Sequence, residues 1–249
     1  MFSAPSPAFD TGKVSYSGIL SPNAVVSLSA SSGQTANSLK YAFETLSAGR
    51  RFAVVPLADG GAFWFATLAA MAAGSSKVGT AADTVAALRG TYDGWHEPIP
   101  GVLHAVACDV AKAVMASESS TLRCDRIHVV PHINRWWDGR TVLVGDAAHA
   151  LPINLAQGAA CAVEGAYLLG VTLAEALFAS PHDVSVTAAG FMRYQATHEP
   201  RVRQCRYVTS MTELLAAPSS PMSEAVRNAM RLVPQPLNGW VFVKLIDII

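Results

Sequence analysis

The sequence predicts an α+β fold, in which a mixed or antiparallel sheet with helices precedes a strand, a loop and a long helix. Two β-rich runs at 51–57 and 62–68 flank an Asp-Gly turn, which is a strong hairpin signal. A β-branched run at 141–144 ends at Gly145, where the backbone can turn sharply. Apolar residues then recur at helical spacing over 159–177.

Composition and charge narrow the class of protein. The 249 residues suffice for one large or two small domains, and a hydrophobic content of 51% can fill a substantial core. The formal net charge is zero, so we expect no nucleic-acid partner and no electrostatic binding to a membrane surface. No signal peptide is visible at the N-terminus. Four widely spaced cysteines predict buried thiols in a reducing, cytoplasmic compartment, namely Cys108, Cys124, Cys161 and Cys205.

The first predicted domain covers residues 1–121. After a Ser/Pro-rich lead, strands at 14–20 and 24–28 are expected around a Ser-Pro-Asn turn. In the hairpin, alternation places Phe52 and Val54 on one face and Ala53 and Val55 on the other. The sequence also predicts a helix at 81–92 and one or two helical turns within 98–113. The aromatic run Phe63, Trp64 and Phe65 has two interpretations, a sheet face packed under helices or a substrate wall.

The second predicted domain covers residues 122–249 and starts with a strand at 122–130. The run at 141–144 is expected to be a buried strand that presents Asp146 at a sheet edge. A helix beginning near Leu155 would direct unpaired N–H groups and the positive end of its dipole at the loop, which favours an anionic or electron-rich group there.

The helix at 159–177 is expected to be amphipathic. Its apolar positions would form the buried face, with Glu164 and Glu175 on the opposite side, so we predict no membrane span. Further helices are predicted at 186–215, with an interruption at Pro200, and at 223–232, before an apolar tail at 237–249. A solvated face is the simplest interpretation of four arginines, Arg193, Arg201, Arg203 and Arg206.

The stretch G-R-T-V-L-V-G-D-A-A-H-A-L-P-I-N-L-A-Q-G, residues 139–158, carries a family resemblance. It resembles the second FAD-contact motif of the flavin-dependent aromatic hydroxylases, the para-hydroxybenzoate hydroxylase-like monooxygenases. The resemblance implies that the Asp146 carboxylate accepts a hydrogen bond from a ribityl hydroxyl of FAD, and that His149 shapes the loop. Read without the resemblance, Asp146 could merely cap a helix.

The same resemblance assigns a set of cofactor-binding residues but no catalytic side chain and no metal ligand. The loop and helix start would lie against the pyrimidine side of the isoalloxazine. The implied FAD contacts are Gly145, Asp146, Pro152, Ala156, Gln157 and Gly158. Two positions depart from the family pattern, since Ala156 replaces a usual glycine and Gly165 a usual acidic residue.

The dinucleotide-binding fingerprint G-x-G-x-x-G does not occur in these 249 residues. The expectation is therefore a substrate-domain-like sheet, followed by the later part of an FAD- and NAD(P)-binding, Rossmann-like fold whose N-terminal half is missing. The resemblance implies an NAD(P)H- and O₂-dependent FAD monooxygenase that hydroxylates or epoxidises a small organic compound, with aromatic compounds as candidates. The alternative is a non-catalytic remnant or interaction module, and in either case exposed apolar surface is expected to favour association.

Overall fold

The structure, a computed structural model, describes residues 8–31, 41–69, 79–179, 185–215 and 221–231. The predicted apolar tail at 237–249 lies outside the described residues. Two compact units are present. We call Gly12–Arg126 the sheet unit, and Ile127–Leu215 with the described residues before Gly12 and after Ser220 the helical unit.

The sheet unit is built on a five-stranded sheet with the order β2-β3-β4-β1-β5. Its strands are β1 (Phe9–Leu20), β2 (Phe43–Ser47), β3 (Arg50–Pro56), β4 (Ala62–Ala69) and β5 (Arg123–Val129). The predicted hairpin is confirmed, because β3 and β4 pair antiparallel with Pro56 opposite Ala62. β1 pairs antiparallel with β4, and β2, which the sequence did not indicate, pairs antiparallel with β3.

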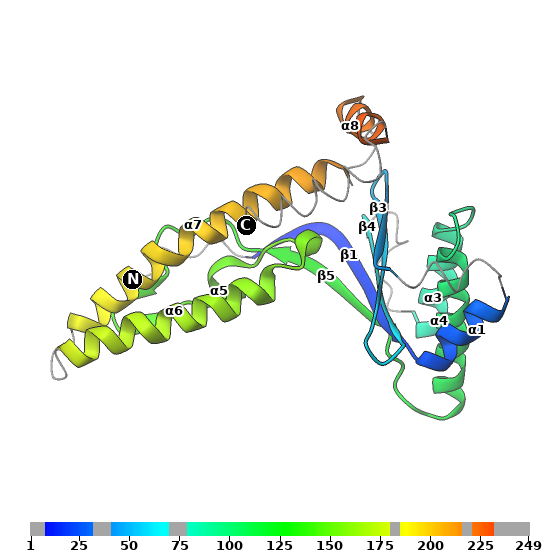
Figure 1. The fold of residues 1–249 in the computed structure, drawn as a ribbon, viewed down its shortest axis with the longest axis horizontal. Helices are drawn as coiled ribbons and strands as arrows, with labels where there is room; N and C mark the ends of the chain where they lie inside the picture. Colours follow the sequence, from blue (N-terminus) through cyan, green and yellow to red (C-terminus); the bar gives the residue numbers. More distant parts are fainter. Residues whose placement is uncertain (1–7, 32–40, 70–78, 180–184, 216–220, 232–249) are drawn as a thin grey trace. The chain divides into compact units, whose positions relative to one another are not determined.

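Three helices cover one face of this sheet: α1 (Pro22–Ser31), α3 (Ala81–Thr91) and α4 (Ile99–Met115) (Figure 1). The predicted alternation in β3 is confirmed, because Phe52 and Val54 are fully buried in the core beneath the helices. Trp64 belongs to the same core and stacks on Phe52 with ring centroids 5.9 Å apart. Burial of such rings is the main stabilising contribution in a sheet covered by helices.

The prediction of a strand at 24–28 was wrong, because these residues lie in α1. Ser21 begins the helix, since its side-chain oxygen accepts a hydrogen bond from the Ala24 N–H at 3.3 Å. Proline is favoured at the first helical position because it has no N–H to leave unsatisfied there. The Ser-Pro-Asn sequence is thus a helix start rather than a turn. α4 is also longer than predicted, with 17 residues.

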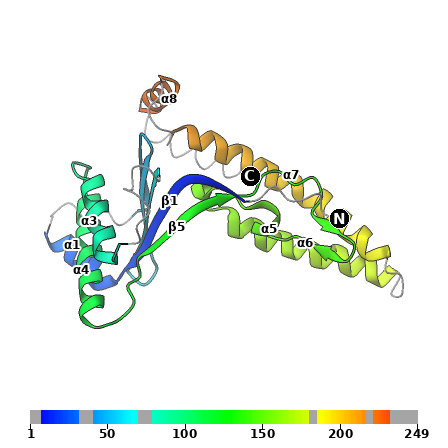
Figure 2. The same ribbon diagram turned by 180° about the vertical axis from the view of Figure 1, so that it is seen from behind.

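The helical unit contains two long antiparallel helices, α6 (Gly158–Ala179) and α7 (Ser185–Leu215), which lie side by side in both ribbon views (Figures 1 and 2). α7 runs through Pro200 as one helix, so the predicted interruption was wrong. The smaller elements of the unit are β6 (Trp137–Asp138), β7 (Thr141–Val142), α5 (Asp146–His149), the 3-10 helix η1 (Ile153–Leu155) and α8 (Pro221–Arg231).

The buried face of α6 is the reverse of the predicted one. Its fully or largely buried residues are Cys161, Gly165 and Thr172, whereas Val163 is 72% and Tyr167 71% exposed. Close packing against α7 explains the difference, because a Cβ atom added to Gly165 would lie 2.8 Å from Nε2 of His198.

The two glutamates of α6 are turned toward α7 rather than away from it. Glu164 pairs with Arg201 at 3.2 Å, and Glu175 pairs with Arg193 at 3.0 Å. Arg206 is also engaged, since its guanidinium donates a hydrogen bond to the Val130 carbonyl at 2.7 Å. The predicted solvated arginine face is therefore wrong for Arg201 and Arg206, which are partly buried.

By length and composition alone, α6 is apolar enough to cross a membrane, with a mean hydropathy of 1.5 over its best window, of which 17% is buried. A single helix of this kind is weak evidence for a membrane span, because the core helix of a soluble protein can have the same length and composition. The four cysteines also differ from the prediction. Cys161 and Cys205 are buried, but Cys108 and Cys124 are exposed.

Candidate functional site

The predicted cofactor loop starts at a sharp backbone turn. β7 has only two residues and pairs with β6, so the expected buried strand at a sheet edge was wrong, and Val144 is exposed. Gly145 adopts φ +54° and ψ −137°, a conformation that residues with a Cβ atom rarely adopt. The chain then enters the single helical turn α5, which starts with Asp146. Gly145 is buried, whereas Asp146 is exposed.

The second half of the loop leads into α6. Pro152 precedes η1, and Ala156 ends it in the left-handed conformation, with φ +53° and ψ +24°. Gln157 follows, and its side-chain oxygen accepts a hydrogen bond from Arg201 at 3.3 Å. α6 begins at Gly158, and the first N–H groups of a helix have no acceptor within the helix. The loop therefore ends at a partly positive helix terminus.

Beneath the loop lies a cluster of buried aromatic and imidazole rings, which we call the ring cluster: Trp136, His149, Tyr194 and His198. The centroid of Trp136 lies 5.4 Å from that of His149 and 5.7 Å from that of Tyr194. The two imidazole centroids are 5.3 Å apart and nearly perpendicular. Within the part of the chain that the structure describes, the His149 and His198 ring nitrogens and the Tyr194 hydroxyl have no hydrogen-bond partner.

The environment of the ring cluster favours the neutral form of both imidazoles. Burial lowers the pKa of His149, and the neighbouring His198 lowers it further. Burial also lowers the pKa of His198, against an opposing effect of Glu164. A neutral, packed His149 agrees with a loop-shaping role and offers no charged group for acid–base chemistry.

The loop residues fit the ribityl and ring portion of a flavin. No described side chain or backbone N–H bonds to the exposed Asp146 carboxylate, so this group is available to accept a hydrogen bond from a sugar hydroxyl. A Cβ atom on Gly145 would lie 3.3 Å from the Ala162 side chain, so the backbone needs glycine here. All six predicted contacts lie on one continuous loop and helix start, residues 145–158.

Sequence reasoning missed the residues that support this loop from behind. Tyr194, His198 and Arg201 come from α7, more than thirty residues after the loop, whereas Trp136 lies just before the loop in the chain. The spacing of Glu164 and Arg201 gave no signal, because an ion pair between two helices has no sequence period. These residues position the loop rather than form its surface.

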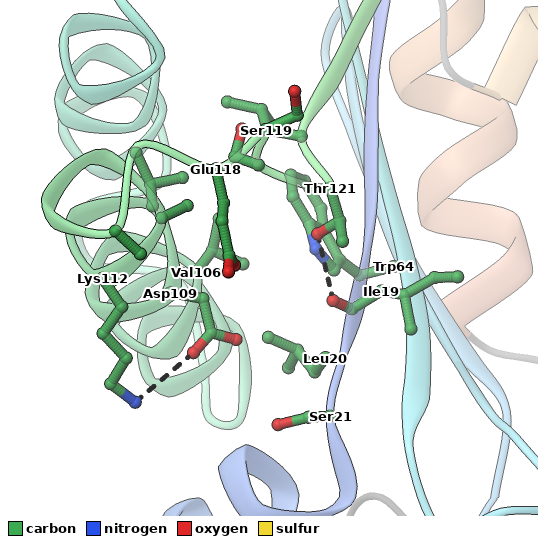
Figure 3. A pocket seen from close by; sticks show the side chains of 15 residues that line it. Ile19, Leu20, Ser21, Trp64, Val106, Asp109, Lys112, Glu118, Ser119 and Thr121 are labelled. Carbon is green, nitrogen blue, oxygen red and sulfur yellow. Dashed lines mark hydrogen bonds and ion pairs between the residues drawn. The ribbon is translucent and has the colours of Figure 1, made fainter.

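A hollow in the sheet unit contains none of the predicted site residues. It has a volume of about 330 Å³ and lies between α4, the end of β1 and the segment before β5 (Figure 3). Trp64 and Leu20 line its apolar side, and the ion pair of Asp109 with Lys112 lies at its rim. It opens on the helix-covered face of the sheet, so it is separate from the face that carries Phe63 and Phe65.

Ala156 is a position of backbone strain in the loop, because it adopts positive φ without being glycine. A left-handed backbone conformation costs an L-residue about 1–2 kcal/mol. Replacement by glycine removes this cost, but the greater entropy of glycine in the unfolded chain cancels part of the gain. We therefore expect Ala156→Gly to raise the free energy of unfolding by about 0.5–1 kcal/mol in urea denaturation. Ala160→Gly, on the exposed side of the first turn of α6, is the matched control and should lower stability by about 1 kcal/mol. A loss of stability in both variants would contradict the assigned strain.

Comparison with known proteins relates part of this chain to FAD-binding proteins. Residues 109–184 match the family described as FAD binding domain. The chain is 36% identical over 129 residues to the aurachin C monooxygenase/isomerase of Stigmatella aurantiaca, covering 52% of this chain and 30% of that protein. It is 30% identical over 156 residues to the FAD-dependent urate hydroxylase of Klebsiella pneumoniae, covering 62% of this chain and 35% of that protein.

Solved structures show the same fold. A variant of Klebsiella pneumoniae HpxO complexed with FAD superposes with a TM-score of 0.72 and 19% identity, over 98% of this chain and 55% of that one. A salicylate hydroxylase substrate complex gives a TM-score of 0.61 and 16% identity, over 90% of this chain and 54% of that one. This chain is thus similar in sequence to a monooxygenase and to an FAD-dependent hydroxylase, it shares the fold of the two solved proteins named above, and it spans about half the length of those solved chains.

Proposed function

We propose that this chain contributes the isoalloxazine-side loop and the substrate-facing sheet of an FAD-dependent monooxygenase. The observation that carries the proposal is the loop itself, in which Gly145 at positive φ presents the exposed Asp146 beside the start of α6. Such a loop supplies both a carboxylate for sugar hydroxyls and a positive helix terminus for an electron-rich ring. FAD, when bound, would supply the redox chemistry with O₂, with NAD(P)H as the reductant.

In this proposal the chain's own residues bind and orient and do not react. Asp146 would hold the ribityl chain, and Pro152, Ala156, Gln157 and Gly158 would line the ring edge. The helix start at Gly158 would stabilise negative charge on the pyrimidine side. The ring cluster beneath keeps the loop in place and excludes water from its inner side.

The substrate would lie against the face of the sheet opposite α3 and α4. Phe63 and Phe65 belong to that face, with ring centroids 6.2 Å apart, whereas Trp64 between them points into the core. The Arg51 guanidinium lies 5.7 Å from the centre of the Phe65 ring and is paired with Glu44. Flat aromatic rings beside a guanidinium suit a small, planar organic substrate.

The remaining expectations are part of the same proposal. A cytoplasmic location stays an expectation, and the ion pairs that tie α6 to α7 support the proposed lack of a membrane span. Association through apolar surface is supported by the exposure of Val163, Tyr167 and Phe178 on α6. The non-catalytic alternative rests on one observation, that the sequence contains no G-x-G pair with which to hold a pyrophosphate.

Titration with FAD separates the two functions. We expect the chain alone to bind FAD weakly, because only the ribityl and ring contacts are available to it. Addition of a segment that carries a G-x-G-x-x-G fingerprint, in trans or as a fusion, should produce tight binding and the yellow colour of a flavoprotein. If that addition leaves the flavin unbound, the non-catalytic alternative is correct. Stoichiometric FAD on the chain alone would show instead that the nucleotide lies elsewhere.

Asp146 gives the residue-level prediction of this proposal. A hydrogen bond to a charged group contributes about 1.5–3 kcal/mol, and about 1.4 kcal/mol corresponds to a factor of ten. Asp146→Ala should therefore weaken FAD binding at least about tenfold in the complemented protein, measured by flavin fluorescence. Glu175→Gln removes the same charge near the other end of α6 and should leave the affinity unchanged. If the unsubstituted protein, Asp146→Ala and Glu175→Gln bind FAD with equal affinity, Asp146 is not part of the site.

A further inference from the structure

Two buried thiols face each other across the interface of the two long helices. Cys161 lies in the first turns of α6 and Cys205 in α7, and both are fully buried. Their sulfur atoms are 3.6 Å apart, although the residues are 44 positions apart in the chain. No group of three or more metal-binding side chains exists in the described parts of the chain, so a metal does not account for the pair.

The packing of α6 against α7 allows a covalent bond at this position. A Cβ atom added to Gly165 would clash with His198, and one added to Gly190 would lie 3.3 Å from the Cα atom of Leu173. Helices that approach this closely bring facing Cα atoms into the range that disulfides span, about 4.4–6.8 Å. Bond formation needs the sulfur atoms to move from 3.6 Å to about 2.05 Å, which small side-chain rotations can provide.

We propose that Cys161 and Cys205 form a redox modification site, in which hydrogen peroxide converts the two thiols into a disulfide that joins α6 to α7. In the first step the Cys205 thiolate attacks one peroxide oxygen and the O–O bond breaks. Hydroxide departs as the leaving group, and Cys205 becomes a sulfenic acid. The Cys161 sulfur then attacks the sulfenic sulfur, and its proton leaves with the hydroxyl group as water. Two thiols and one peroxide thus give one disulfide and two waters.

The contact between the sulfur atoms also sets which thiol reacts first. The hydrogen bond from the Cys161 thiol lowers the pKa of Cys205, and the same bond raises the pKa of Cys161. A thiol of lowered pKa carries more thiolate and attacks an oxidant faster. Hydrogen peroxide is small and neutral, so transient separation of the two helices is enough to admit it.

The bond would act on the loop that we assign to FAD. The Cys161 N–H donates a hydrogen bond to the Gln157 carbonyl at 2.9 Å, and Arg201 of α7 contacts the Gln157 side chain. A disulfide at Cys161 would fix the start of α6 to α7 directly behind this loop. Its formation does not depend on flavin binding, so the site stands or fails independently of the proposed function.

Peptide mapping of the whole chain tests the site without any substitution. Protein reduced and then treated with hydrogen peroxide is denatured, blocked with N-ethylmaleimide and digested with trypsin. We expect the peptide 141–193, which contains Cys161, to be linked to the peptide 204–206, which contains Cys205. The intact chain should lose about 2 Da, return to the reduced mass with dithiothreitol, and unfold about 5–10 °C higher when oxidised.

Variants separate this bond from reactions of the exposed thiols. Cys108→Ser with Cys124→Ser removes both exposed cysteines and should still form the linked peptides, whereas Cys205→Ala should not. The proposal is overturned if peroxide carries Cys205 to sulfinic acid while Cys161 remains open to alkylation. It is equally overturned if both buried thiols stay reduced while only the exposed pair reacts.

Discussion

Replacement of Trp136 by alanine is expected to lower the free energy of unfolding of the helical unit by about 3–5 kcal/mol. The indole is 2% exposed and contacts the rings of His149, Tyr194 and His198. Its removal leaves a cavity under the predicted cofactor loop, and the surrounding helices cannot collapse into it without breaking their own packing. Urea denaturation followed by circular dichroism measures the loss.

The neighbouring Trp137 is the matched control. It is only half-buried, and the Arg135 guanidinium lies 4.1 Å from its ring centre. Trp137→Ala should therefore cost about 1 kcal/mol or less, because the contact is partly solvated. Equal losses in the two variants would show that the ring cluster does not hold the unit together. A large loss in Trp136→Ala should also weaken FAD binding in the complemented protein, since the loop loses its support.

The sheet was the most predictable part of the fold, because its signals are local. The Asp-Gly turn fixed the β3–β4 hairpin, and alternation fixed which face of β3 is buried. A local signal gave the wrong prediction at Ser21 and Pro22, where a turn was expected and a helix begins. Serine and proline are favoured both in turns and at helix starts. Only the packing of α1 on the sheet decides between the two, and packing is not a local property.

The orientation of α6 could not be predicted from its own residues. Both sides of the helix carry apolar or small side chains. The usual rule that charged residues face solvent therefore predicted the wrong buried face. The decisive features are Gly165, which admits His198, and Glu164, which pairs with Arg201. Both partners are in α7, more than thirty residues later, where nothing in the sequence marks them as partners.

The candidate site was predicted to the extent that one continuous stretch forms it. Gly145 and Asp146 lie at the turn where the motif placed them, and α6 starts at Gly158 close to the predicted position. The preceding strand was overestimated, because the β-branched run at 141–144 pairs for only two residues. The resemblance marks Ala156 as a departure, and its positive φ explains physically why glycine suits that position.

The ring cluster makes the stability of the helical unit depend on pH. His149 and His198 are buried, and both have a pKa below the ordinary value of 6.5. Asp146 and Arg206 act in opposite directions on His149, as Glu164 and Arg201 do on His198, so burial decides the sign. In the unfolded chain both imidazoles take up a proton as the pH falls through 6.5, whereas in the folded chain they do so only at lower pH. Stability is therefore retained above pH 6.5 and lost as the pH falls below it.

The expected slope is steep because two groups contribute. Each histidine that is protonated only in the unfolded chain removes up to about 1.4 kcal/mol per pH unit, so the pair removes up to about 2.7 kcal/mol per unit. Urea denaturation between about pH 7.5 and pH 5.5 should show this loss, and His198→Gln should roughly halve its slope. His104→Gln, which changes an exposed histidine on α4 outside the ring cluster, is the control variant. If stability is the same at both ends of this range, the two buried imidazoles are not neutral in the folded protein, and the ring cluster must contain a proton acceptor that balances them.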